Sequence, residues 1–183
     1  MRLKGKVVVV TASTRGIGLA IVKACAAEGA IVYMGARNLE RAKEIADQLN
    51  AEGKKVRWVY NDATEDESYA AMIEEVVEKE GRIDVLVNNA GHGQFTYFEE
   101  SDEQQIRDVF ETNLFGLMRV TRAVLPVMRR QHAGHIFNIS SAAGYSGVGP
   151  SIYHTSKFAV TGFSESLAFE TEQFGIRVTI VAP

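Results

Sequence analysis

The sequence is poor in residues that stiffen or cross-link a chain: it has three prolines and a single cysteine, Cys25, among 183 residues. One cysteine excludes an internal disulfide and a zinc site built from several cysteines. Its neighbours are all alanines, at positions 24, 26 and 27. Such a run of small residues is typical of a helix face packed on a sheet, so we expect a buried thiol.

The chain also has little net charge and no long hydrophobic run. It carries 20 Lys and Arg against 23 Asp and Glu, a formal charge of -3, so it lacks the basic footprint of nucleic-acid or anionic-membrane binders. The apolar run at 7–12 is far shorter than the roughly 20 residues of a membrane helix, and no secretory cleavage site follows the first residues. We expect a cytoplasmic protein with small-molecule partners and with neither nucleic acid nor membrane among them.

The composition is that of one globular domain. Hydrophobic residues make up 46% and charged residues 23%, and a chain of this length favours a single domain over residues 1–183. Short Val- and Ile-rich runs alternate with amphipathic segments, the pattern of βαβ units around a parallel sheet. The expected strands are 6–11, 30–35, 55–60, 83–88, 134–141 and 176–182. The expected helices are 18–28, 39–51, 66–80, 102–130 and 153–174.

Glycine and proline mark the expected helix ends. Glycines at positions 29, 53, 81 and 175 each follow a helical segment, where glycine readily adopts the left-handed conformation that closes a helix. Pro126 falls inside the fourth helical pattern, where a proline kinks or divides a helix.

The first strand leads into a glycine-containing turn, and an amphipathic helix follows at once. Glycines let the backbone approach a pyrophosphate closely, while the free N–H groups and dipole of the helix favour its negative charge. Small residues also occur in purely structural strand-to-helix turns, but this turn lies at the first strand–helix junction, where dinucleotides bind. The candidate cofactor contacts here are Thr11, Ser13, Thr14, Arg15, Gly16, Ile17 and Gly18.

The second strand predicts which dinucleotide binds. It is followed by Arg37 and Asn38, about 20 residues beyond the glycines, where an NAD site places an acid for the ribose 2′-hydroxyl. Arg37 could instead pair with a 2′-phosphate, and Arg15 could reach the same group from the other side. The alternative is that both arginines are solvated surface charges. The sequence therefore favours NADP(H), with Arg37 and Asn38 as further contacts.

Motifs along the whole chain agree in order and spacing with those of one family. They are the glycine turn, Asp62 after the third strand, Asn88-Asn89-Ala90-Gly91 after the fourth, Asn113 in the long helix, Ser140-Ser141-Ala142-Ala143-Gly144 after the fifth, and Tyr153-His154-Thr155-Ser156-Lys157. Over essentially its whole length the sequence resembles the short-chain dehydrogenases/reductases. The resemblance implies a three-layer, Rossmann-like, doubly wound α/β fold with a parallel sheet in the order 3-2-1-4-5-6. It also implies cofactor contacts from Asp62, Ala63, Asn89, Ala90, Gly91, Tyr153, Lys157 and Pro183.

The resemblance implies catalytic roles as well. Tyr153 and Lys157 are four residues apart and share a helix face, and a nearby ammonium favours the phenolate form of a tyrosine. Tyr153 would exchange a proton with the substrate oxygen, and Lys157 would also hold the nicotinamide ribose. Asn113 would support a water-mediated proton relay to the lysine, although an asparagine inside a helix can equally be a structural amide.

A serine hydroxyl would polarise the substrate carbonyl. The Ser-Ser-x-x-Gly register favours Ser141, whereas the usual family distance from the tyrosine favours Ser140; we take Ser141 as the expected residue. His92 and His154 flank these motifs without a cysteine or carboxylate cluster, so no metal site is expected.

The sequence departs from the family pattern in two places. Ala12 replaces the first glycine of the turn, which is tolerable if that position does not need a positive φ. The chain stops at Pro183, where family members continue with a nicotinamide-contacting loop, a substrate lid and a seventh strand. We therefore expect a truncated chain whose missing seventh strand leaves the sheet edge uncovered and whose substrate pocket lacks a wall.

Two functions follow as expectations. The first is an NADP(H)-dependent oxidoreductase, homodimeric or homotetrameric, that interconverts a ketone or aldehyde and an alcohol by hydride transfer, with the tyrosine as general acid or base. The second is a non-catalytic dinucleotide-binding or assembly fragment that lacks the substrate lid. The sequence leaves the identity and stereochemistry of the substrate open.

Overall fold

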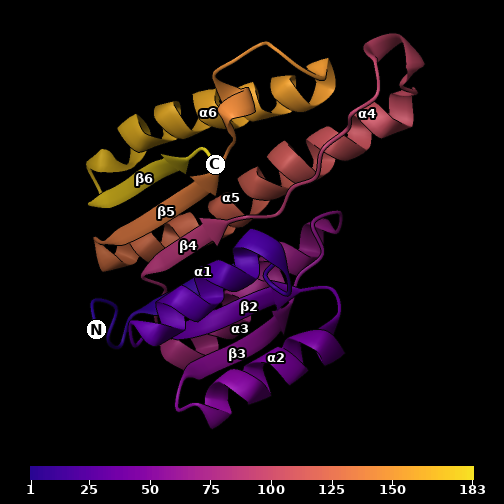
Figure 1. The fold of residues 1–183 in the computed structure, drawn as a ribbon. Coiled ribbons are helices and arrows are strands. Elements are labelled where there is room, and N and C mark those ends of the chain that lie inside the picture. The colour runs from indigo at the N-terminus through magenta and orange to yellow at the C-terminus, as the bar shows by residue number, and fades with distance from the viewer.

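The computed structural model describes residues 1–183, except for the side chain of residue 66. Six strands form one sheet in the order β3-β2-β1-β4-β5-β6 (Figure 1), and every neighbouring pair is parallel. The strands are β1 (Val7–Val10), β2 (Ile31–Ala36), β3 (Lys55–Tyr60), β4 (Val85–Asn88), β5 (Gly134–Ile139) and β6 (Ile176–Val181). The expected fold and strand order are confirmed, and each strand begins and ends within two residues of its prediction.

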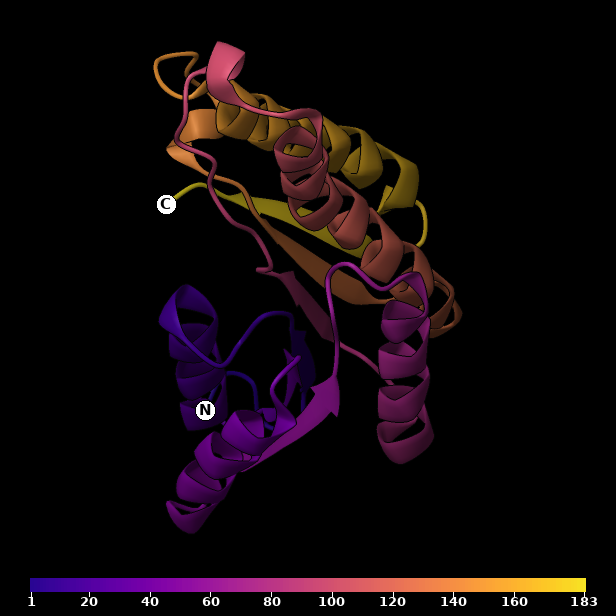
Figure 2. The same ribbon diagram turned by 90° about the vertical axis from the view of Figure 1, so that its right-hand side faces the viewer.

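Helices lie on both faces of this sheet (Figure 2). One face carries α1 (Gly16–Ala27) and α2 (Leu39–Ala51), and the other carries α3 (Asp66–Glu80), α5 (Gly116–Gln131) and α6 (Ser151–Glu172). The shorter α4 (Glu103–Phe110), the 3₁₀ turns η1 (Phe98–Glu100) and η3 (Ala142–Gly144), and a π-helical turn between α4 and α5 complete the described elements. None of the described helices is both long and apolar enough to cross a membrane.

The four valines of β1 show why the sheet is buried on both faces. Val7 and Val9 pack with residues of α3 and α5, whereas Val8 and Val10 pack with α1 and α2. All four are at most 1% exposed, because successive side chains of a strand point to opposite faces. Cys25 on α1 packs against the core but is only partly buried, so this thiol is less buried than the sequence predicts.

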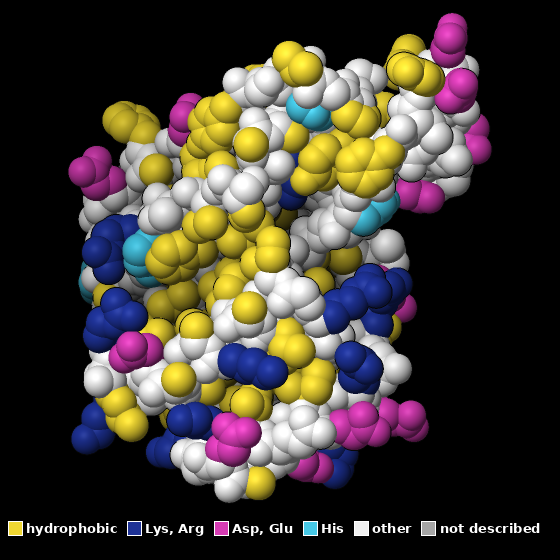
Figure 3. Space-filling model, in the orientation of Figure 1, with side chains coloured by type: hydrophobic (Ala, Val, Ile, Leu, Met, Phe, Trp, Pro, Cys, Tyr) yellow, Lys and Arg dark blue, Asp and Glu magenta, His cyan; other side chains and the backbone are white. Residues whose placement is uncertain are grey.

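The face that carries α1 and α2 is only partly covered. Val85 of β4 and Phe137 of β5 pack at the margin of this core and remain partly exposed. Figure 3 shows a band of hydrophobic side chains on this side of the molecule, over β4 and β5.

The helix ends agree with the glycine pattern, whereas the fourth helix differs from its prediction. Glycines 29, 53, 81 and 175 all have positive φ. The segment predicted as one helix over 102–130 is α4, a π-helical turn η2 (Glu111–Phe115) and α5. Pro126 lies inside α5 and does not end it. Pro126 and Arg122 are both exposed, so water can bond the Arg122 carbonyl that loses its helical partner.

Candidate functional site

Most candidate residues lie at the carboxyl edge of the sheet, because they directly follow the ends of parallel strands, whereas Asn113, Tyr153 and Lys157 come from helical segments. The turn after β1 is tied to its neighbours by side-chain hydrogen bonds. Thr11 Oγ1 accepts from the backbone N–H groups of Asn89 (2.9 Å) and Ala90 (3.1 Å). The Asn89 amide donates to the carbonyls of Thr11 (3.1 Å) and Ala12 (3.0 Å), and buried Ser13 bonds the Gly35 carbonyl. Thr11, Ser13 and Asn89, predicted as cofactor contacts, therefore use these polar groups to shape the turn.

The glycine turn contains a strained alanine. Ala12 has φ +49° and Gly16 has φ +53°. Position 12 therefore does need a positive φ, and the alanine backbone is held in the left-handed conformation that L-residues avoid. A Cβ at Gly18 would lie 2.7 Å from the Ala12 carbonyl oxygen and 2.9 Å from Ser13 Cα. Only glycine therefore fits at position 18.

The outer part of the turn is open to a ligand. A Cβ at Gly16 would meet nothing within 4 Å, and Arg15 and Ile17 are exposed while Thr14 is partly buried. This exposed backbone forms the start of α1, so the first N–H groups of the helix face the space beyond the strand ends.

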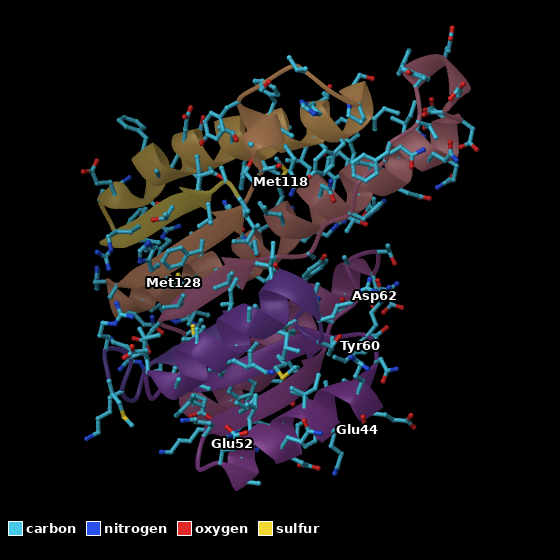
Figure 4. The ribbon with its side chains drawn as sticks, in the orientation of Figure 1. Glu44, Glu52, Tyr60, Asp62, Met118 and Met128 are labelled. Carbon is cyan, nitrogen blue, oxygen red and sulfur yellow. The ribbon has the colours of Figure 1, made fainter. Side chains whose placement is uncertain are left out.

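An ion pair marks the corner where β2 and β3 end. Arg37 is 72% exposed in its side chain, and its Nη1 lies 3.9 Å from Oδ2 of Asp62. The other oxygen of Asp62 accepts from the N–H and hydroxyl of Thr64. Asp62 lies with Tyr60 at this edge of the sheet (Figure 4). The structure thus places Arg37 and Asp62 together at the strand ends.

The next residues along the chain, Asn38 and Arg41, form hydrogen bonds within the protein. The Asn38 side chain caps α2 by accepting from the N–H of Arg41 at 2.9 Å. Arg41, which the sequence motifs did not single out, donates from Nε to the Thr14 carbonyl at 3.4 Å. One feature of the sequence could have identified Arg41: it lies in the first turn of the helix that follows Arg37.

Tyr153 and Lys157 lie side by side near the start of α6. The Nζ atom of Lys157 is 5.8 Å from the centre of the Tyr153 ring and donates to the Ile139 carbonyl at 3.0 Å. Lys157 is only 5% exposed, and this burial lowers its pKa to about 8 because the protein interior disfavours the charged form. The Tyr153 ring is flanked by Phe95, with ring centres 5.9 Å apart.

Buried Asn113 joins this pair to the loop after β4. Its Nδ2 donates to the His92 carbonyl and to Ser156 Oγ, and its Oδ1 accepts from the His92 N–H. A Cβ at Gly91 would lie 3.2 Å from Asn113 Oδ1 and 3.5 Å from Lys157 Nζ. Both groups therefore border the same point of the loop. The half-buried Ala63 and Ala90 lie in the neighbouring loops after β3 and β4.

The two candidate serines have different surroundings. Ser140 is 3% exposed, and its Oγ bonds the Lys157 carbonyl and Thr161 Oγ1. Ser141 is partly exposed, and its Oγ accepts from the Ala143 N–H at 3.2 Å. Pro183, the last predicted contact, accepts through its carbonyl from Ala142.

Comparisons with known proteins agree with this geometry. Residues 6–183 match the family model described as short chain dehydrogenase. An oxidoreductase from Botryotinia fuckeliana is 38% identical, over 97% of this chain and 65% of its own length. The 7alpha-hydroxysteroid dehydrogenase of Clostridium sardiniense is 36% identical, over 100% of this chain and 71% of its own length. The chain thus spans about two thirds of the length of such curated relatives.

Among solved structures, a metagenomic short-chain oxidoreductase in complex with NADP superposes with a TM-score of 0.95 at 35% identity, over 100% of this chain and 84% of that one. Its likeness covers the glycine turn and the Tyr153–Lys157 pair alike. A family match that runs from residue 6 to the last residue, on a sheet of the expected strand order, shows that the chain belongs to the short-chain dehydrogenase family.

Proposed function

We propose that the protein is an NADP(H)-dependent oxidoreductase that interconverts a ketone or aldehyde and an alcohol. The observation that carries this proposal is the buried Lys157 ammonium, 5.8 Å from the Tyr153 ring, at the sheet edge that also holds an open glycine turn. This pair is suited to exchange a proton with a substrate oxygen beside a cofactor bound at the glycine turn.

The residues at the strand ends fit a dinucleotide. A Cβ at Gly16 would meet no protein atom within 4 Å, which leaves the backbone there open to a pyrophosphate, and Gly18 lets α1 pack closely against the turn. Arg15 and Arg37 would bind a 2′-phosphate. The relative that was solved in complex with NADP supports this cofactor. When bound, the cofactor supplies or accepts the hydride at its nicotinamide.

The side chains of the chain itself would handle the proton. Tyr153 donates a proton to the carbonyl oxygen during reduction and accepts it from the alcohol during oxidation. Lys157, fixed by the Ile139 carbonyl, would hold the nicotinamide ribose. Because Asn113 and Lys157 both border Gly91, Asn113 is placed to support proton exchange with the lysine and to hold the loop there.

The surroundings of the serines support Ser141 as the group that polarises the carbonyl. Its hydroxyl proton is free to turn toward a substrate oxygen, because its Oγ only accepts, from Ala143, in the protein. The Ser140 hydroxyl is buried among Lys157 and Thr161 and acts as an internal structural group.

The proposal is tested by titrating the purified protein with NADPH and NADH and then assaying it with a panel of ketones and aldehydes. We expect tighter NADPH binding and NADPH oxidation that depends on the carbonyl compound. Cofactor binding without turnover of any carbonyl would instead support a dinucleotide-binding module. Absence of binding to either nucleotide would contradict both functions.

A further inference from the structure

We propose that Arg41 is a third arginine of the cofactor site, which binds the 2′-phosphate of NADP(H) and so selects this cofactor over NAD(H). The inference rests on the proposed cofactor and adds a specificity-determining residue to it. It is carried by where the Arg41 side chain lies, by which groups it contacts, and by the charge of its neighbours.

Two hydrogen bonds fix Arg41 beside the glycine turn. Its backbone N–H is held by the capping side chain of Asn38 at 2.9 Å, which sets where the first turn of α2 begins. Its Nε then reaches across to the Thr14 carbonyl at 3.4 Å. The guanidinium is thereby directed toward the turn that carries Arg15, the residue next to Thr14 in the chain.

The terminal nitrogens of Arg41 are available for a ligand. A guanidinium has five donors in a planar fork, and the bond to Thr14 engages only the Nε donor. Neither Arg41 nor Arg15 forms an ion pair with a carboxylate among the residues that the structure describes. Arg37, in contrast, lies 3.9 Å from Asp62, so part of its charge is already balanced.

The charges show why a third cation is needed. A phosphate monoester carries about 1.5 to 2 negative charges near neutral pH, and Asp62 adds one more at this corner. Arg15 and Arg37 supply two positive charges against these, which leaves the anion short of one cation. Arg41 supplies that charge and a bidentate fork of the shape that phosphate oxygens accept. Figure 3 shows Lys and Arg side chains gathered at the edge where α2 begins in Figure 1.

The test compares cofactor affinity in Arg41→Gln and in a matched control, using the full protein and no turnover. Lys43→Gln serves as the control, because Lys43 lies two residues away on the same helix and pairs with Asp47 at 2.7 Å. Dissociation constants for NADPH and NADH are measured by fluorescence titration. We expect Arg41→Gln to weaken NADPH binding about tenfold, the usual scale for a lost charge-assisted hydrogen bond, with little change for NADH. Arg41→Lys should lie between wild type and Arg41→Gln, and Lys43→Gln should bind both nucleotides like wild type.

Three results would overturn the role of Arg41. Unchanged affinities for both NADPH and NADH in Arg41→Gln, in a wild type that prefers NADPH, would refute this inference and leave the proposed cofactor intact. An equal loss for both nucleotides would mean that Arg41 acts only by holding the glycine turn through Thr14. A wild type that prefers NADH would overturn the proposed cofactor and the role of Arg41 together.

Discussion

The side chain of Asn113 and the backbone of His92 form two hydrogen bonds, one in each direction. Nδ2 donates to the His92 carbonyl and Oδ1 accepts from the His92 N–H, both at 2.9 Å. The amide thus donates one hydrogen bond and accepts one from the same residue, as a paired backbone segment would. Because Asn113 lies in the π-helical turn and also donates to Ser156 of α6, it joins three elements around the proposed catalytic pair.

Replacing this amide should affect both stability and catalysis. Asn113→Ala leaves the partly buried backbone groups of His92 and the buried Ser156 hydroxyl without this partner, which costs about 1 to 3 kcal/mol of unfolding free energy. It should also lower kcat, because the loop beside Lys157 loses its anchor. Urea unfolding and steady-state kinetics measure the two effects.

Asn50 offers a matched control for that substitution. Its side chain makes the same two-way pair with the backbone of Val56, at 2.9 and 2.8 Å, far from the strand ends that form the site. Asn50→Ala should therefore lower stability while leaving kcat unchanged. Equal kinetic effects of the two variants would show that Asn113 has no special relation to the site.

Burial of Lys157 predicts a stability that rises with pH. The pKa of this lysine is about 8 in the folded protein against 10.5 as reference, so between these values the unfolded chain binds more protons than the folded one. Stability should then increase as pH rises through this window, by on the order of 3 kcal/mol. Lys157→Met should be more stable than wild type near pH 7, and its advantage should disappear by about pH 10.5, the upper end of the window. A constant difference between the two proteins across this range would contradict the shift.

The strain at Ala12 predicts a stabilising substitution. A left-handed alanine costs about 1 to 2 kcal/mol. Glycine removes this cost, but it lowers stability by about 0.5 to 1 kcal/mol because the unfolded chain gains conformational freedom. Ala12→Gly should therefore raise the unfolding free energy by about 0.5 to 1 kcal/mol, read from urea unfolding curves. Gly18→Ala should have the opposite effect and disrupt the turn, because its Cβ would meet backbone atoms at less than 3 Å.

The two adjacent serines should respond differently to alanine. Ser141→Ala should reduce kcat about 100- to 1,000-fold, the usual loss when a donor to a developing oxyanion is removed, with little change in stability. Ser140→Ala should mainly lower stability, by about 1 to 3 kcal/mol, because the buried Thr161 hydroxyl loses its Ser140 partner. The reverse pattern would assign the catalytic role to Ser140.

The sequence predicted what depends on local pattern and missed what depends on neighbours in space. The burial of β1 on both faces and the positive-φ glycines follow from residue type alone, and so do the strand ends that bring the motifs together. The break in the fourth helix was expected at Pro126 but lies at Glu111–Phe115. The hydrogen bonds that Asn113 makes from this turn to another loop and another helix are visible only in three dimensions.

The same reasoning explains the missed residues of the site. A sequence does not show that Ala12 needs a positive φ, because this depends on how the turn is tied to Asn89. It also does not show that the Phe95 ring lies beside Tyr153 or that Arg41 reaches the Thr14 carbonyl, since both contacts join separate segments. The residues in such contacts are not separated by a characteristic number of positions, so no sequence motif reveals them.

The central claim is that Tyr153 exchanges the proton with the substrate, and Tyr153→Phe tests it most directly because one oxygen atom is removed while the ring contact with Phe95 is kept. Tyr97→Phe, at a residue 78% exposed, is the matched control. We predict that Tyr153→Phe binds NADPH as wild type does but loses turnover at least about 100-fold, whereas Tyr97→Phe keeps it. Wild-type turnover in Tyr153→Phe would contradict the account.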